Sequence, residues 1–372
     1  MKKAVLTAAG LLLASLAHAD VAATGEAIAA ALNKRDVNAT LRQIDADAVG
    51  RAVIKDLGLN TADRDTVLKV FPNALRTNVE LGIRTIDGTK GTAKYMRSGE
   101  RNGRPFALLR YDLGDQGIDY VEYYVGKTDK VEDWYVHSLA TLFSTSARLG
   151  LSSLLKTDSM LFSLFGSRMT TQADAKPFIE LRASLQKQDF AAAYRTLETF
   201  PEDFRKTRQW ALMRVAYGGR VDGDTHRAAL RYLAQNFGKD PELQFMLIDH
   251  FFFEKQFDGA LAALGALERA IGGEDAATAS LRGNILTAAQ RYNEAAVACR
   301  RGMKLEADHK AAYWCLVTVG LSTKNGKVAV EGLKAYEGAF SVEFNLGELA
   351  GLAAYKEIAS TPEFVAWRKS RR

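Results

Sequence analysis

The sequence predicts an α+β domain, built from helices and a four-stranded antiparallel meander, followed by an all-α solenoid of repeated helix pairs. Three observations lead to this fold class. Residues 84–138 alternate apolar and polar side chains in aromatic-rich segments separated by turn signals. Residues 175–372 are rich in alanine and leucine at helical spacing, and a small-residue pattern recurs there at a nearly constant interval.

The first residues, MKKAVLTAAGLLLASLAHAD, have the pattern of a secretory signal. Two lysines precede an apolar stretch, and Ala17-His18-Ala19 is typical of a cleavage site before Asp20. The apolar stretch is short for a membrane span, and polar sequence follows it at once. We therefore expect residues 1–19 to be removed, no transmembrane segment after cleavage, and a periplasmic or secreted mature protein.

Charge argues against a nucleic-acid partner. The whole chain has a formal charge of +6; without Lys2 and Lys3 it keeps 48 basic and 44 acidic residues, a charge of +4. The excess matches a C-terminal cluster of Arg368, Lys369 and the last two arginines. A frayed basic terminus is not the basic stripe that nucleic-acid binders carry on their binding surface.

Length and composition together indicate two domains after the signal. About 350 mature residues exceed what one core normally serves. We predict an α+β domain over residues 20–168, a linker at 169–177, and a helical repeat domain over 178–372. Its last segment, Gly347 to Arg372, is expected to be a terminal capping helix.

The first domain should begin with helices, over residues 21–35, in the segments through Asp56, and from Asp63 to Gly82 with Asp63 as the N-cap. Four strands follow at residues 91–97, 105–112, 118–125 and 131–138, with hairpin turns such as Asn102-Gly103 between them. Helices followed by a meander resemble cystatin-like and nuclear-transport-factor-like α+β folds. The resemblance concerns architecture only, since the second of these folds places a strand pair between its helices.

Alternation places three polar or aromatic residues on one face of the third strand and three on one face of the fourth. If these faces coincide, the sheet presents carboxylates, an imidazole and phenols together. These residues are Tyr120, Glu122, Tyr124, Asp133, Tyr135 and His137. A histidine beside a carboxylate can serve as a general acid or base. The competing interpretation, which we favour, is a solvated or domain-facing sheet surface with ordinary cross-strand pairs.

Other chemical motifs are missing from the sequence. It contains no GxSxG, no HExxH and no glycine-rich phosphate loop. Asp249-His250 has no third ligand spaced nearby, so a metal site is not expected there. We predict no catalytic residue, no cofactor and no metal.

The repeat is carried by five four-residue segments with a small residue at their end. They begin at Phe190, Thr225, Phe257, Tyr292 and Lys327, with separations of 35, 32, 35 and 35 residues. This pattern resembles tetratricopeptide repeats over roughly residues 175–340, whose unit is about 34 residues. In that frame the small positions are Ala193, Ala228, Ala260, Ala295 and Gly283, and Trp314 matches the early aromatic. Thr225, Lys327 and Val330 depart from the pattern.

Solenoids of helix pairs present a concave surface lined by the first helix of each pair. An exported module that binds a peptide or protein segment there is the leading function. The predicted partner-binding residues are Arg182, Trp210, Tyr217, Arg220, Glu242, Phe245, Asp249 and Asn284. Of these, Trp210, Tyr217, Arg220, Phe245 and Asp249 are expected to be exposed. The alternatives are an enzyme that uses the sheet of the first domain, or a small-ligand carrier with an apolar cavity between sheet and helices.

The two cysteines, Cys299 and Cys315, are 16 residues apart, on neighbouring helices of the repeat frame. An oxidising compartment favours a disulfide between them. Two small buried thiols at crowded helix crossings are the alternative.

Overall fold

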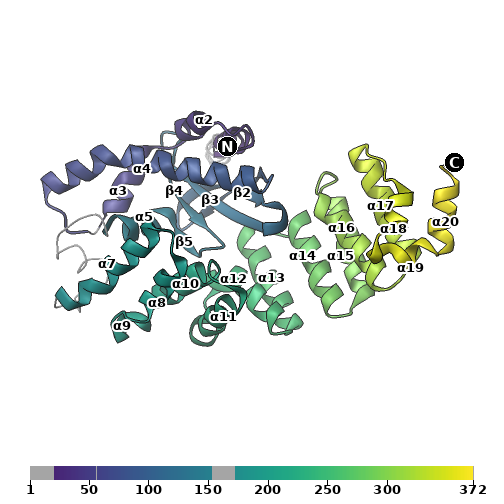
Figure 1. The fold of residues 1–372 in the computed structure, drawn as a ribbon. Coiled ribbons are helices and arrows are strands. Elements are labelled where there is room, and N and C mark those ends of the chain that lie inside the picture. The colour runs from purple at the N-terminus through teal and green to yellow at the C-terminus, as the bar shows by residue number, and fades with distance from the viewer. Residues whose placement is uncertain (1–20, 56, 153–171, 372) are drawn as a thin grey trace, which may run out of the picture. The chain divides into compact units, whose positions relative to one another are not determined.

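The structure, a computed structural model, describes residues 21–55, 57–152 and 172–371 (Figure 1). The predicted signal sequence and residues 169–171 of the predicted linker lie outside these described residues. The chain forms two compact units, Met1–Phe237 and Gly238–Arg372, and each is described by itself.

The division falls after residue 237, later than the linker that composition predicts at 169–177. Residues 172–177 belong to a helix, and the helices that follow it up to Phe237 pack within the first unit. One direct link is the Arg208 guanidinium, whose Nη2 donates to the carbonyl of Ala140 beside the sheet at 3.1 Å.

Unit 1 contains a helix at residues 21–33, then helices, five strands and further helices. The elements are α2 Val37–Arg42, α3 Ala46–Ile54, α4 Thr61–Gly88, β1 Thr92–Arg101, β2 Arg104–Asp112, η1 Gly114–Gln116, β3 Ile118–Val125, β4 Val131–Val136, β5 Thr141–Leu142, α5 Phe143–Ser152, α7 Gln172–Gln186, α8 Phe190–Leu197, α9 Glu202–Arg205, α10 Arg208–Gly218 and α11 Gly223–Phe237.

The sheet is an antiparallel meander in the order β1-β2-β3-β4-β5. The four predicted strands are all present, and β5 is a short fifth strand that the sequence did not indicate. The β1–β2 turn is Asn102-Gly103, and both residues have positive φ (53° and 73°), as a two-residue hairpin requires. His137 lies one residue beyond the end of β4, in a turn.

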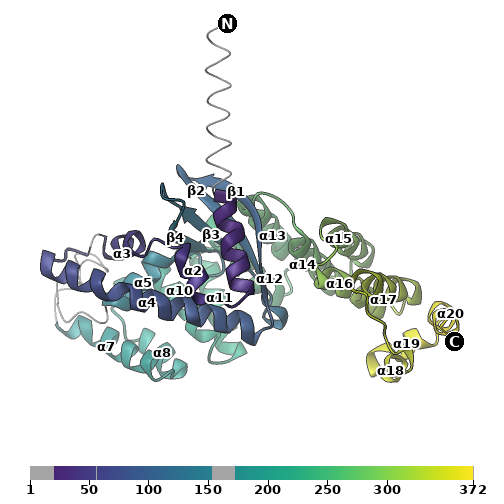
Figure 2. The same cartoon turned by 90° about the horizontal axis from the view of Figure 1, so that it is seen from above.

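One face of the sheet is covered by the helix of residues 21–33 and by α4 (Figure 2). Ile28, Phe71 and Leu75 from the helices pack with Leu109 and Val121 from the strands in one buried core. Asn33 fixes the end of the first helix, since its side chain both accepts from the Ala93 amide and donates to the Ala93 carbonyl at 2.8 Å.

Helix α4 is longer than predicted, because it starts before Asp63 and continues past Gly82. Its N-cap is Asn60, whose Oδ1 accepts from the backbone N–H of Asp63 at 2.9 Å. The predicted capping role of Asp63 is therefore wrong. Asp63 instead lies in the first turn, where its charge favours the helix dipole.

Unit 2 consists of helices. They are η2 Pro241–Leu243, α12 Gln244–Phe253, α13 Phe257–Ile271, α14 Ala276–Ala288, α15 Tyr292–Leu305, α16 Lys310–Ser322, α17 Gly326–Phe340, α18 Leu346–Gly351, η3 Ala353–Tyr355, α19 Lys356–Ala359 and α20 Pro362–Lys369.

Small residues allow the helices of unit 2 to approach closely. Ala260, Ala295 and Ala329 are all fully buried at the same place, the fourth residue of α13, α15 and α17. A Cβ on Gly320 would collide with the backbone of Ala329, so only glycine fits at the crossing of α16 with α17. The sequence pattern ends its fifth segment at Val330, but the small residue buried where α16 crosses α17 is Ala329, one position earlier.

A similar register difference occurs in α11 of unit 1. Ala228 is exposed, while its neighbour Ala229 is fully buried. Ala229 is the seventh residue of α11, whereas the buried alanines of α13, α15 and α17 are each the fourth residue of their helix. Helix α11 therefore starts about one turn further ahead of its buried alanine. The predicted small position at Ala228 is therefore wrong by one residue.

The C-terminal segment is not the single capping helix that the sequence predicts. It is divided into α18, η3, α19 and α20, and Pro362 begins the last of these. Phe364 and Trp367 are buried in a cluster with Val317 and Leu333, so the segment still covers an apolar face of the preceding helices.

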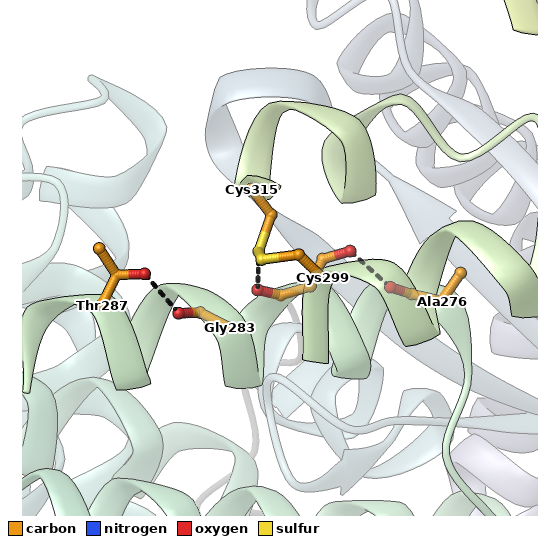
Figure 3. Close-up of a disulfide and its surroundings, with 6 residues drawn as sticks. Ala276, Gly283, Thr287, Cys299 and Cys315 are labelled. Carbon is orange, nitrogen blue, oxygen red and sulfur yellow. Dashed lines mark hydrogen bonds between the residues drawn. A yellow bond between two sulfur atoms is a disulfide. The ribbon is translucent and has the colours of Figure 1, made fainter. Parts of the chain in front are cut away.

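Cys299 on α15 and Cys315 on α16 form a disulfide, with their Cα atoms 5.5 Å apart (Figure 3). Both are buried, and α14 lies beside them. A Cβ on Gly283 would collide with both sulfur atoms, so this glycine makes room for the bridge.

Among the described residues, no helix combines the length and the apolar character that crossing a membrane requires.

Candidate functional site

A cleft of about 470 Å³ lies in unit 1 between the sheet and the helices that cover it. Its walls are mainly apolar, with Ile28 and Leu32 from the first helix, Ile86 from α4 and Val121 from β3. Volumes of this size are typical of sites that hold small organic molecules.

The mouth of the cleft is marked by exposed residues. Gly82 and Thr85 on α4 are exposed, and Leu139, which follows β4, is 43% exposed. Arg220, just after α10, is also exposed and lines the cleft, with its guanidinium carbon 5.3 Å from the centre of the Phe190 ring. A positive charge therefore borders the entrance to an apolar space.

Aromatic rings form one side of the cleft. Trp134 on β4 stacks on Phe143 at the start of α5, with ring centres 3.9 Å apart and planes at 15°. Tyr123 lies next to Trp134, at 6.0 Å between ring centres. The stacked rings give this side of the cleft a rigid, apolar lining.

Two tyrosines supply hydroxyl groups to this apolar space. Tyr111 on β2 and Tyr123 on β3 both line the cleft, and their hydroxyls share a short hydrogen bond. Burial raises the pKa of Tyr123 to about 12, and burial together with the neighbouring Tyr123 raises the pKa of Tyr111 well above its ordinary value. Both phenols therefore keep their protons at neutral pH.

Asp119 at the start of β3 is the acidic group of the cleft. Its carboxylate accepts from the Ser138 hydroxyl at 2.5 Å, the Ser138 amide at 3.1 Å and its neighbour's amide at 2.7 Å. Burial raises the pKa of Asp119, although these hydrogen bonds act in the opposite direction. The Asp119 charge also contributes to the raised pKa values of both tyrosines.

The opposite face of the same strands carries the residues that the sequence predicted as a runner-up site. We call these six residues the Glu122 face: Tyr120, Glu122, Tyr124, Asp133, Tyr135 and His137. All six are buried. The register pairs Glu122 with Tyr135 and Tyr124 with Asp133, so these residues do share one side of the sheet.

Glu122 is the centre of this face, and its side chain is fully buried. Arg101 Nη2 donates to its Oε1 at 2.6 Å, His137 Nε2 lies 3.1 Å from the same oxygen, and the Tyr124 hydroxyl donates to Oε2 at 3.1 Å. Burial alone raises the pKa of Glu122, but the hydrogen bond and charge of His137, with the charge of Arg101, outweigh it, and the pKa is lowered.

Asp133 is held separately from Glu122. Its carboxylate accepts from the Ser144 hydroxyl at 2.6 Å and from the backbone amides of Ser144 and Trp134. The two buried carboxylates therefore have their own partners. The face is buried and therefore not a solvated surface, and the side-chain partner of Asp133 comes from α5 and not from a facing strand.

The predicted partner-binding residues are divided between the two units. In unit 1 the exposure predicted for Trp210 is wrong, because the side chain is only 3% exposed and its Nε1 donates to the Leu197 carbonyl at 2.7 Å. Tyr217 is half-buried, and burial raises its pKa. The side chain of Arg182 lies outside the described part of the chain.

In unit 2 the predicted residues lie on η2, α12 and α14. Glu242, Asp249 and Asn284 are exposed, and Phe245 is half-buried. Their role as partner contacts stays a prediction.

Sequence reasoning did not select the cleft residues, although a usable signal was present. The strand IDYVEYYV carries tyrosines on both of its faces. Tyr120 and Tyr124 drew attention to one face, whereas Asp119, Val121 and Tyr123 line the cleft on the other.

In the described ranges, no group of three or more histidine, cysteine, aspartate or glutamate side chains is arranged to hold a metal ion. Comparison with family models, with curated proteins and with solved structures gave no match.

Proposed function

We propose that unit 1 binds a small, largely apolar molecule in the cleft between its sheet and helices. The observation that carries this proposal is the combination of apolar walls with a few converging polar groups, Tyr111, Tyr123 and Asp119. Small-molecule sites commonly have this composition, with apolar groups for affinity and a few polar groups for orientation.

Perturbed ionisable groups in a cleft add support, because they mark functional sites more often than other surfaces. The raised pKa values of Asp119 and the two tyrosines have burial as their main cause, and all three side chains line the same space. On the Glu122 face, by contrast, the buried carboxylates are occupied by neighbouring side chains. This difference favours a carrier or binding protein over an enzyme that uses the Glu122 face.

Two glycines of α4 allow a matched test of the cleft. Gly82 lines the mouth, Gly88 does not line the cleft, and a Cβ at either position would meet nothing within 4 Å. The Gly82→Phe variant should obstruct the entrance, and the Gly88→Phe variant should not. The probe is N-phenyl-1-naphthylamine, a neutral apolar dye whose fluorescence rises on leaving water.

We expect wild type and Gly88→Phe to bind the dye with equal affinity, and Gly82→Phe to bind it at least tenfold more weakly. Equal binding by all three proteins would place the dye elsewhere and contradict the proposed site. Thermal unfolding of the three proteins controls for changes in the fold.

A second candidate function, which the sequence ranked first, is an interaction module. We propose that the helix pairs of unit 2 form a tetratricopeptide-like solenoid that holds a peptide or protein segment against its first helices. Helices α13 and α15 begin at Phe257 and Tyr292, as the predicted period requires, and α17 begins one residue before Lys327. Trp314 on α16 supports a contact surface, since it is 38% exposed and lies 5.3 Å from the Tyr336 ring.

This second proposal can be tested with variants on first and second helices. Immobilised protein is exposed to a periplasmic extract, and the retained proteins are identified. Asn284→Ala with Trp314→Ala, on α14 and α16, should abolish specific retention. Val297→Ala changes a residue that is 66% exposed on the second helix α15 and should leave retention intact. Equal retention by both variants would contradict a surface on the first helices.

We also propose that the mature protein is exported to the periplasm or outside the cell. The disulfide between Cys299 and Cys315 supports this, because such bonds persist in oxidising compartments. N-terminal sequencing of the mature protein would test it, with Asp20 as the expected first residue.

A further inference from the structure

The hydrogen-bond capacity of Tyr111 and Tyr123 indicates which chemical group enters the cleft. Two phenol hydroxyls have two protons, and the bond between them uses one. Among the described residues, no acceptor takes the second proton. The pair therefore presents an available donor to an apolar space.

Water can accept from this donor while the cleft is open, but a ligand that displaces water without offering an acceptor leaves a buried polar group without a partner, which is unfavourable. A ligand oxygen that accepts this proton avoids that cost. The raised pKa values of both phenols keep the donor protonated at neutral pH. Selectivity for an acceptor oxygen follows.

The charge around the pair distinguishes a neutral acceptor from an anion. Asp119 lines the same cleft as the two tyrosines, and its charge contributes to the raised pKa of both, so negative charge beside the hydroxyl pair is disfavoured. The positive charge of Arg220 lies at the exposed entrance, so an anionic group placed at the hydroxyl pair would meet the repulsion of Asp119. A carbonyl oxygen accepts the proton without adding charge.

The aromatic lining suits the apolar rest of such a ligand. Trp134 and Phe143 are stacked on each other beside Tyr123, so the lining next to the hydroxyl pair is rigid and apolar. An apolar body can pack against this lining while its oxygen reaches the hydroxyl pair.

We propose that the cleft recognises apolar molecules that bear a neutral carbonyl oxygen, which accepts a hydrogen bond from the Tyr111–Tyr123 hydroxyl pair. This inference rests on the proposed small-molecule site and adds the chemical class of its ligand.

The test compares three naphthalenes of similar shape as competitors of N-phenyl-1-naphthylamine. 2-Acetylnaphthalene carries a ketone, 2-ethylnaphthalene lacks an oxygen, and 2-naphthoate carries a charge. Wild type should bind the ketone about tenfold more tightly than the hydrocarbon, the factor that corresponds to one hydrogen bond of ordinary strength. The carboxylate should bind more weakly than the ketone.

Variants assign the preference to the hydroxyl pair. Tyr111→Phe with Tyr123→Phe should remove the tenfold preference, so that the ketone and the hydrocarbon bind with similar affinity; thermal unfolding controls for changes in the fold. Either single variant keeps one hydroxyl donor and should retain most of the preference. Tyr95→Phe is the control, because it removes a tyrosine hydroxyl bonded to Ser98 at 2.8 Å outside the cleft lining.

The outcomes separate this inference from the proposed function. Equal affinities for the ketone and the hydrocarbon in wild type, with both displacing the dye, would overturn the carbonyl inference and leave the cleft as a site. Tightest binding of 2-naphthoate would overturn the choice of a neutral group. Absence of dye binding to wild type would instead refute the small-molecule site itself.

Discussion

The two faces of the sheet in unit 1 carry the same kinds of residues, but these residues have different roles. On the Glu122 face, one carboxylate receives hydrogen bonds from Arg101 and Tyr124 and contacts His137. On the cleft face, the Tyr111–Tyr123 pair shares one bond and keeps a further donor for a molecule from outside. The difference lies in the cleft beside the hydroxyl pair, which none of the six residues of the Glu122 face lines.

This comparison shows why a cluster of acid, imidazole and phenol groups is weak evidence for a site. Buried polar groups in folded proteins are nearly always hydrogen-bonded to one another, and such pairing serves stability. A binding site needs space and an unsatisfied group together. The cleft face has both, whereas the buried Glu122 carboxylate already has its partners.

The largest expected effect concerns the Glu122 face. Glu122→Ala leaves Arg101 and His137 without their carboxylate, and breaking a buried ion pair typically costs about 3–5 kcal/mol. Urea unfolding should show a loss of this order for unit 1. A much smaller change would mean that the face is solvated rather than structural.

Dye affinity gives the second measurement on Glu122→Ala. At a temperature where the variant is folded, N-phenyl-1-naphthylamine should bind as it does to wild type, because the two faces have separate roles. A strong loss of affinity in the folded variant would connect the two faces and weaken the comparison.

A second, somewhat smaller effect is expected in unit 2. Cys299 and Cys315 close a short loop, and a disulfide across a loop of about 15 residues contributes about 3 kcal/mol. Replacing both cysteines by alanine should lower the unfolding midpoint of unit 2 by a corresponding amount. Unchanged unfolding, or two free thiols in native material by mass spectrometry, would contradict a stabilising bridge.

The smallest expected effects are opposite pH dependences of the two faces. The pKa of Glu122 is lowered on folding, so its stabilising contribution is present above its unfolded value of about 4.3 and is lost as the pH falls through the folded value. The stability difference between wild type and Glu122→Gln should therefore shrink in acid.

Asp119 should behave in the reverse way. Its pKa is raised on folding, so the folded state binds the proton more tightly, and stability declines as the pH rises from about 3.9 through the folded value. Asp119→Asn should therefore gain stability relative to wild type over that rise. Urea unfolding midpoints from pH 3 to 8 should be measured for wild type, Glu122→Gln and Asp119→Asn. If the difference of each variant from wild type does not change with pH, the opposite pKa shifts of Glu122 and Asp119 are contradicted.

Local sequence signals were sufficient for much of the fold. Asn102-Gly103 predicted the β1–β2 turn because positive φ at two successive residues favours these residue types. The spacing of Phe257 and Tyr292 predicted the starts of α13 and α15, since each helix meets its partner through a small residue at the same place. Alternation also placed Glu122, Tyr120 and Tyr124 on one face of β3, while the strand register decided that Tyr135 and Asp133 lie opposite them.

Tertiary packing decided what local patterns leave open. Alternation separates the two faces of β3, but only the helix of residues 21–33 and α4 determine that Tyr123 borders a cleft while Glu122 is enclosed among its neighbours. Tryptophan is common at protein contacts, but Trp210 is buried, because it packs in a hydrophobic core and donates a hydrogen bond to the Leu197 carbonyl. Sequence determined the periodicity of each segment because that depends on neighbouring residues. The site depends on which surfaces meet across long distances in the chain, and no single segment encodes that.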